Sequence, residues 1–197
     1  MNIARSGQTG SLAPAQIASV ASRLATRIDR PIVLVGMMGV GKSTVGRKLA
    51  AALGLPFADA DDEIATAAQM SINEIFEHFG EDHFRDGERR VIARLLEGGR
   101  GVVATGGGAF VQEDTRQLIL DKGIAVWLDC DVDTLVERLK RTNKRPLLRG
   151  GNVREIVTRM KTEREGAYAQ APVHVFSGSG AHTDTVAQIL GAIDKWL

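Results

Sequence analysis

The sequence predicts an α/β fold of three layers, α/β/α, in which helices cover both faces of a five-stranded parallel sheet. From residue 31 onward, short apolar runs rich in β-branched residues alternate with longer stretches of helical periodicity, as in stacked βαβ units. Several of these runs are apolar at nearly every position, which indicates strands with both faces buried. A chain of 197 residues has the length expected of one such domain.

Five runs have the length and composition of β-strands. They cover residues 32–35, 56–59, 101–104, 124–128 and 173–176. The first, third and fourth are the most continuously apolar, so we expect these three to be buried on both faces. A single apolar stripe near the end of the chain predicts a final helix packed on the core. Its members are Val186, Ile189, Leu190, Ile193 and Leu197.

Residues 1–30 form an extension whose composition differs from that of the domain over residues 31–197. The extension is rich in Ser, Gly, Ala, Gln and Arg, and no acidic residue precedes Asp29. After Pro14, apolar residues recur three to four positions apart, which predicts an amphipathic helix lying against the domain. These residues are Ile17, Val20, Leu24 and Ile28. An organelle transit peptide is the alternative, because such peptides are also amphipathic, contain Arg and Ser, and have few acidic residues.

Composition disfavours several classes of function. The formal net charge is only +1, so the chain lacks the broad basic surface that non-specific binding of nucleic acid requires. No apolar run approaches the roughly 20 residues that span a bilayer. Cys130 is the only cysteine, which excludes an internal disulfide and a multi-cysteine metal site, and we expect it to be structural. We therefore expect a cytoplasmic protein with neither nucleic acid nor membrane as a partner. We also expect a monomer, which the composition itself does not determine.

A glycine-rich motif follows the first predicted strand and precedes a helical run over residues 45–53. Residues 36–44 read Gly-Met-Met-Gly-Val-Gly-Lys-Ser-Thr, which has the spacing of a P-loop. Glycines let backbone N–H groups turn inward around phosphate oxygens, and the following helix N-terminus adds partial positive charge. The alternative is a glycine-rich turn with an incidental lysine, but the strand before it and the helix after it favour a nucleotide site.

The P-loop predicts which residues bind the nucleotide. We expect phosphate contacts from Gly39, Val40, Gly41, Lys42, Ser43 and Thr44. Lys42 can reach the β- and γ-phosphates, and the Ser43 hydroxyl can ligate Mg²⁺. The only Asn-Lys pair is followed by Arg145 and Pro146, so the Asn-Lys-x-Asp pattern of guanine recognition is missing. The nucleotide is therefore expected to be ATP.

The second predicted strand ends in an Asp-x-Asp pattern formed by Asp59 and Asp61. Sites in open α/β sheets form at the carboxyl ends of strands. If the strand continued, both carboxylates would share a face, and one could serve a metal ion while the other faced an acceptor hydroxyl. A helix N-cap followed by acidic residues in the first turn explains Asp61, Asp62 and Glu63 equally well.

Three further features lie near predicted strand ends or on helices. Glycines at residues 106–108 allow close contact between backbone and a ligand, although a tight turn is the alternative. Arg85 and Glu88 lie three apart on a charged helix and can pair, as residues on solvated helix faces often do. Basic residues in and before residues 141–152 predict a mobile lid over phosphates, with an ordinary surface loop as the alternative. They are Arg138, Arg141, Lys144, Arg145 and Arg149.

In order and spacing, these motifs resemble those of the shikimate kinase family of P-loop kinases over nearly all of residues 31–170. The resemblance rests on residues 36–46, 59–61, 75–88, 106–108 and 145–148. It implies the P-loop kinase fold with a lid at about residues 141–152. It also implies transfer of the γ-phosphoryl group of ATP to the 3-hydroxyl of shikimate. The products would be shikimate 3-phosphate and ADP, on the pathway to chorismate and the aromatic amino acids.

The resemblance implies roles for the residues on the nucleotide side. Asp59 would hold Mg²⁺ through water, together with the Ser43 hydroxyl. Arg138 would stack near the adenine, and Arg145 would reach the transferring phosphate from the lid. Lys42, Arg145 and Asp61 would be the catalytic residues.

On the acceptor side, the resemblance implies that Asp61 contacts the hydroxyl that is phosphorylated. Arg85 and Arg164 would hold the shikimate carboxylate, and Gly107 would contribute backbone to the substrate. A planar guanidinium matches a carboxylate with two parallel hydrogen bonds, which makes arginine the expected residue for this task. Glu88 would orient Arg85.

The segment after the fifth strand departs from the family. Members commonly have an Asp-Thr pair and a proline there, whereas residues 177–182 read Ser-Gly-Ser-Gly-Ala-His, so the adenine contacts of this loop stay open. The four histidines show no metal-ligand spacing, and we expect all of them at the surface. They are His78, His83, His174 and His182.

Two other functions are compatible with a P-loop. One is a kinase for gluconate or a nucleoside monophosphate, and the other is an ATP-gated regulatory module that hydrolyses ATP slowly. The combination of Asp61 with Arg85 and Arg164 favours a substrate cavity and therefore a kinase.

Overall fold

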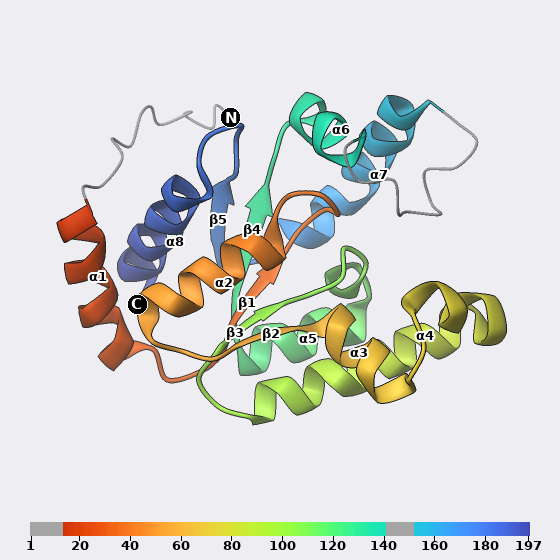
Figure 1. The fold of residues 1–197 in the computed structure, drawn as a ribbon, viewed down its shortest axis with the longest axis horizontal. Coiled ribbons are helices and arrows are strands. Elements are labelled where there is room, and N and C mark those ends of the chain that lie inside the picture. Colours follow the sequence, from red (N-terminus) through yellow and green to blue (C-terminus); the bar gives the residue numbers. More distant parts are fainter. Residues whose placement is uncertain (1–13, 141–151) are drawn as a thin grey trace.

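The computed structural model describes residues 14–140 and 152–197 and confirms the predicted three-layer α/β/α fold (Figure 1). All strand pairs in the sheet are parallel, and the strand order is β2-β3-β1-β4-β5. The strands are β1 Ile32–Val35, β2 Phe57–Asp59, β3 Val102–Ala104, β4 Ile124–Asp129 and β5 Val173–Phe176. Each of the five predicted strands is therefore confirmed, within one residue at either end.

Helices cover both faces of the sheet. The helices are α1 Pro14–Arg27, α2 Lys42–Leu53, α3 Ala60–Ala68, α4 Ile72–Glu97, α5 Glu113–Lys122, α6 Val132–Lys140, α7 Val153–Tyr168 and α8 His182–Trp196, with a short 3₁₀ turn, η1, at Ala109–Val111. Figure 1 shows α1, α2 and α8 packed together on one side and α4, α5 and α7 on the other. Among the described helices, none is long and apolar enough to cross a membrane.

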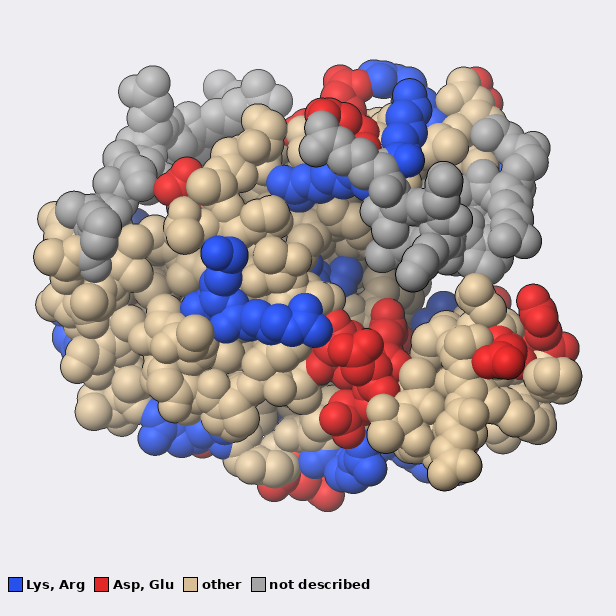
Figure 2. Space-filling model, in the orientation of Figure 1, with Lys and Arg blue, Asp and Glu red and all other residues tan. Residues whose placement is uncertain are grey.

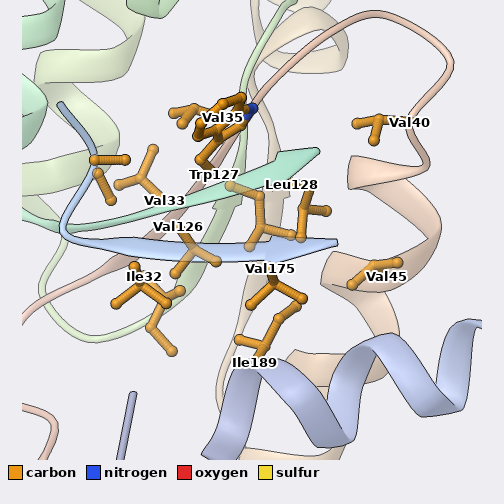
Figure 3. Packing of buried hydrophobic residues seen from close by; sticks show 14 of the residues in the cluster. Ile32, Val33, Val35, Val40, Val45, Val126, Trp127, Leu128, Val175 and Ile189 are labelled. Carbon is orange, nitrogen blue, oxygen red and sulfur yellow. The ribbon is translucent and has the colours of Figure 1, made fainter. Parts of the chain in front are cut away.

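The core lies between the sheet and these two helix layers. Every residue of β1 and β3, and all of β4 except its last residue, is buried, as the continuous apolar runs predicted. On the edge strand β5, Val173 and Val175 are buried whereas His174 and Phe176 are exposed. Figure 3 shows Val175 pointing toward Ile189 of α8. The sheet is thus a rigid platform whose strands all end on one edge.

Helix α1 packs on the domain through its apolar face. Leu24 is fully buried, and Arg23 and Arg27 both pair with Asp194 of α8. The Nη1 atom of Arg27 lies 2.7 Å from Oδ1 of Asp194. These contacts are made far from the carboxyl ends of the strands, so we assign α1 no part in the site.

The predicted lid over residues 141–152 falls outside the described residues, apart from Asn152. The Asn152 side chain accepts a hydrogen bond from the Arg154 amide and caps the N-terminus of α7. Helix α7 therefore begins directly after the segment that holds Arg145.

Candidate active site

The P-loop connects β1 to α2 and has the backbone shape that its glycines permit. Gly36, Gly39 and Gly41 have φ angles of 132°, 81° and 102°, a region that L side chains rarely adopt. Lys42 is the first residue of α2, and its side chain is buried against its own loop. Its Nζ donates to the Gly36 carbonyl at 2.8 Å and to the Met37 carbonyl at 2.9 Å. The ammonium is thus held where the loop faces the end of the sheet.

A cavity of about 220 Å³ lies beside the P-loop, and we call it the loop cavity. It brings together three of the motifs predicted from sequence: the P-loop, the Asp-x-Asp pattern and the glycine-rich turn after β3. Its lining consists of Met38, Gly39, Gly41, Lys42, Ser43, Thr44, Asp59, Asp61, Thr105, Gly106 and Gly107. Figure 2 shows acidic side chains gathered over the start of α3, at the border of this hollow. The lining therefore includes one basic residue, Lys42, and two acidic ones, Asp59 and Asp61.

The Asp-x-Asp pattern lies at the junction of β2 and α3. Strand β2 ends at Asp59, whose side chain accepts a hydrogen bond from the Asp61 amide at 3.1 Å and caps α3. Of the two alternatives left open by the sequence, the N-cap is confirmed and the continuing strand is not, because the helix begins at Ala60. Both carboxylates nevertheless line the loop cavity.

The oxygen donors beside the P-loop fit a magnesium ion. Ser43 offers a hydroxyl and Asp59 a carboxylate, and both line the loop cavity. Within the described residues, no cluster of three or more His, Cys, Asp or Glu side chains is arranged to hold a metal. Mg²⁺ does not require such a cluster, because it usually keeps several waters and binds through one or two protein oxygens together with substrate phosphates.

Arg85 and Glu88 form a partly buried pair on α4. Arg85 Nη1 donates to Oε2 of Glu88 at 2.7 Å, and Arg85 Nη2 donates to Oε1 of Glu81 at 3.1 Å. Glu88 is only 1% exposed, so the alternative of a solvated helix face is wrong for this residue. Burial disfavours the charge of Arg85, but the two glutamates outweigh it and raise the pKa of the guanidinium.

The other oxygen of Glu88, Oε1, is buried and has no hydrogen-bond partner among the described residues. Burial raises the pKa of Glu88, and the nearby Asp61 charge adds to the rise, although Arg85 opposes it. A Cβ atom on Gly106 would lie 2.7 Å from Glu88 Oε1 and 2.9 Å from Asp61 Oδ1. Glycine is therefore needed at residue 106 for the two carboxyl groups to approach the turn.

The neighbouring glycines of this turn serve other contacts. A Cβ atom on Gly108 would lie 2.5 Å from Arg85 Nη2, so glycine leaves room for the guanidinium. The Gly107 carbonyl accepts hydrogen bonds from Tyr168 and from Arg164 Nη1, the latter at 3.2 Å. The structure thus brings Arg164 and Arg85 to the same glycine-rich turn.

Tyr168 is a residue that sequence reasoning missed. It is almost fully buried at the end of α7, and its hydroxyl donates to the Gly107 carbonyl. The one signal in the sequence is its spacing of four from Arg164, which puts both side chains on one face of a helix.

Arg138 of α6 contacts the P-loop and the segment after β5. Its Nη1 donates to the Val40 carbonyl at 2.9 Å, and its Nη2 donates to the Gly178 carbonyl at 2.6 Å. Ser177 Oγ also donates to the Val40 carbonyl, at 3.3 Å. Hydrogen bonds therefore connect the segment after β5 to the P-loop.

His182 corrects the expectation that all four histidines lie at the surface. It is half-buried, and its Nε2 lies 3.3 Å from the position that a Cβ atom on Gly41 would take. Burial lowers the pKa of His182, and the charges of Arg138 and Lys48 lower it further. The other three histidines are exposed, as predicted.

Replacing Glu88 by Gln should make the stability of the fold less dependent on pH. The folded state raises the pKa of Glu88, so its carboxyl stabilises the fold fully below the unfolded pKa, and this contribution is lost as the pH rises through the folded pKa. We expect the melting temperature of the wild type minus that of Glu88→Gln to decrease as the pH rises from the unfolded to the folded pKa of Glu88. Melting curves from about pH 4 to about pH 8 measure this difference. Glu165→Gln, at an exposed site, is the control. A difference that does not change with pH would contradict the raised pKa.

Known proteins resemble this chain over most of its length. The sequence model of the family described as shikimate kinase matches residues 38–194. A shikimate kinase of Novosphingobium aromaticivorans is 63% identical over 179 residues, which cover 89% of this chain and 93% of that protein. A shikimate kinase of Zymomonas mobilis is 50% identical over 166 residues, which cover 84% of this chain and 94% of that protein. A solved structure of shikimate kinase from Acinetobacter baumannii in complex with shikimate matches with a TM-score of 0.81 and 36% identity, covering 88% of this chain and 97% of that chain.

Proposed function

The chain belongs to the shikimate kinase family, and we propose that it transfers the γ-phosphoryl group of ATP to the 3-hydroxyl of shikimate in the loop cavity. The products are shikimate 3-phosphate and ADP, on the route to chorismate and the aromatic amino acids. One observation carries this proposal: Lys42, Asp61 and Gly107 come from three separate motifs and line the same cavity. Residues 31–197 form the kinase domain in this proposal, and residues 1–30 are an extension of it.

On the nucleotide side, the P-loop backbone from Gly39 to Thr44 binds the phosphates of ATP. Lys42 turns from the loop carbonyls toward the β- and γ-phosphates, because a triphosphate is a stronger partner for an ammonium than two neutral carbonyls. The N-terminus of α2 adds its partial positive charge. Arg138 lies against Val40 and lines the side on which the adenine binds.

Ser43 and Asp59 are the residues that would hold Mg²⁺, Ser43 through its hydroxyl and Asp59 through water. When bound, the ion supplies charge neutralisation between the β- and γ-phosphates. Asp59 also caps α3, so one residue fixes the turn that carries Asp61 and contributes an oxygen to the metal site.

On the acceptor side, Asp61 orients the hydroxyl of shikimate and takes its proton late in the transfer. The transition state of phosphoryl transfer is loose, so the protein contributes mainly alignment and charge neutralisation. Arg85 and Arg164 hold the carboxylate at the other end of the substrate, and Gly107 contributes backbone between them. Their shared position at the glycine-rich turn supports this arrangement.

Arg145 belongs to the lid segment, outside the described residues, and its part in the proposal rests on the sequence resemblance. It neutralises charge on the transferring phosphate from a lid that covers the phosphates and excludes water. ATP hydrolysis without an acceptor should accordingly be slow.

The proposal also includes a monomer in the cytoplasm that binds neither nucleic acid nor membrane. The low net charge supports only the absence of non-specific binding to nucleic acid. The buried position of Cys130, where burial raises the pKa of the thiol, supports a structural role for that residue in a reducing compartment.

A coupled assay of ADP release tests the function with shikimate, gluconate and nucleoside monophosphates as acceptors. We expect rapid release with shikimate and only the slow background with the others. Faster release with gluconate or a nucleoside monophosphate than with shikimate would identify that compound as the acceptor instead. Equally slow release with all of them would favour a regulatory ATPase.

Replacing Arg85 by Lys should chiefly raise the KM for shikimate. One cation remains, but the fork that makes two parallel hydrogen bonds to a carboxylate is lost, so we expect an increase of about tenfold or more. The KM for ATP should stay within about twofold, since Arg85 bonds Glu81 and Glu88 of its own helix and lies against Gly108, on the proposed acceptor side. Arg90→Lys, on the same helix and paired with Asp86, is the matched control. An unchanged KM for shikimate would remove Arg85 from the acceptor site.

A further inference from the structure

Helix α7 is joined to the end of β4 by an ion pair that does not line the loop cavity. Lys161 Nζ donates to Oδ1 of Asp129, the last residue of β4, and to the Cys130 carbonyl at 2.9 Å. The side chains of Lys161 and Asp129 are 24% and 18% exposed, so solvent screens this pair less than it screens the surface pairs of the chain.

Asp129 is held by several donors at once. The Cys130 amide donates to its Oδ1 at 2.7 Å, and His174 Nε2 of β5 lies 3.4 Å from its Oδ2. Burial alone would raise the pKa of Asp129, but the hydrogen bonds from His174 and Lys161 outweigh burial and lower it. The carboxylate is therefore a fixed anchor on the sheet.

The same face of α7 carries the residues that contact the glycine-rich turn. Lys161, Arg164 and Tyr168 are spaced three and four apart, so their side chains follow one another along one face of the helix. Arg164 and Tyr168 both donate to the Gly107 carbonyl. Helix α7 thus bridges two strand ends, with Lys161 at β4 and the other two residues at the turn after β3.

Aromatic packing stiffens this bridge. The Trp127 ring stacks on His174 with centroids 4.0 Å apart and an interplanar angle of 9°, and its other neighbour is Tyr168 at 6.0 Å. A continuous row of rings therefore links the surroundings of Asp129 to the residue that holds Gly107.

We propose that Lys161 is a positioning residue for the acceptor, because its bond to Asp129 fixes α7 on the sheet and so sets the place of Arg164 beside Gly107. This inference rests on the proposed function, in which Arg164 and Gly107 hold the acceptor. The ammonium of Lys161 is directed to Asp129 and the Cys130 carbonyl, and Lys161 does not line the loop cavity. Small displacements of groups that orient a substrate have large kinetic effects, so a residue outside the cavity can control acceptor binding.

Steady-state kinetics of Lys161→Met test the proposal. We expect the KM for shikimate to rise about tenfold, while kcat and the KM for ATP stay within about twofold. Lys161→Arg should restore most of the KM, because it retains a cation for Asp129. A purely structural role would not give this separation of the two KM values.

Two further variants keep the test decisive if Lys161→Met is less stable. The double variant Asp129→Asn with Lys161→Met leaves no uncompensated buried charge, and we expect it to show the same rise in the shikimate KM. Lys122→Met is the matched control, because it removes an ammonium that pairs with Glu97 on a remote surface, and it should behave as the wild type.

Arg164→Lys separates failure of this inference from failure of the proposed function. If Arg164→Lys raises the shikimate KM and both Lys161→Met and the double variant leave it unchanged, the positioning role of Lys161 is overturned. Equal rises in the KM for ATP and for shikimate in Lys161→Met would also overturn it. If Arg164→Lys leaves the shikimate KM unchanged, the acceptor role of Arg164 in the proposed function is wrong.

Discussion

Asp61→Asn should lower kcat by about 10² to 10⁴-fold while leaving the KM for ATP within about threefold of the wild type. Asparagine has nearly the same shape as aspartate and can still accept a hydrogen bond from the acceptor hydroxyl. It cannot take the proton of that hydroxyl, so the loss appears in turnover. Removing this charge also relieves the repulsion between Asp61 and buried Glu88, so the variant should fold.

The next residue provides the control for this prediction. Asp62 is 74% exposed and lies 3.6 Å from Arg47, so Asp62→Asn removes a charge of the same sign from the same helical turn. Its kcat should stay within about twofold of the wild type, because exposed pairs contribute little. Near-normal turnover in Asp61→Asn, measured by coupled ADP release with saturating shikimate, would contradict the role of Asp61 as proton acceptor.

Much of the fold was predictable because a strand buried on both faces has apolar residues at successive positions of the sequence. Ile32–Val35 is apolar throughout, and each of its residues is buried. The P-loop was predictable for a related reason, since a phosphate-binding turn requires glycines at fixed spacing before a lysine. In both cases a local pattern determines the structure.

The geometry of the site was less predictable, because it depends on where a helix begins and on distant partners. The sequence left open whether the second strand continues to Asp61 or a helix begins there. Capping by Asp59 starts α3 at Ala60, and Asp61 lines the cavity from the first turn of that helix. Lys161 and Tyr168 were missed, since their partners lie 32 and 61 residues away in the chain. In the sequence, Lys161 looks like a solvent-exposed lysine on a polar helix, because its partner Asp129 comes close only in the folded structure.

Gly36→Ala should lower the free energy of unfolding by about 4 kcal/mol or more, which is in the range of the most severe single substitutions. A Cβ atom at this position would lie 2.3 Å from the carbonyl oxygen of Leu128, a backbone atom of the neighbouring strand β4. Relief of this clash requires the separation of β1 from β4 in the centre of the sheet. The φ angle of 132° adds strain, because L side chains rarely adopt it.

Gly54→Ala separates the clash from the backbone strain. Gly54 also has a positive φ, 64°, at the end of α2, but a Cβ atom there would meet no other atom within 4 Å among the described residues. We expect this control to lose only about 1 kcal/mol, the cost of placing alanine in the left-handed region. Urea unfolding of both variants measures the difference, and similar midpoints would show that Leu128 moves aside at little cost. Since Gly36 is the first residue of the P-loop, a large difference would mean that packing of β1 against β4, as well as phosphate binding, requires glycine at this position.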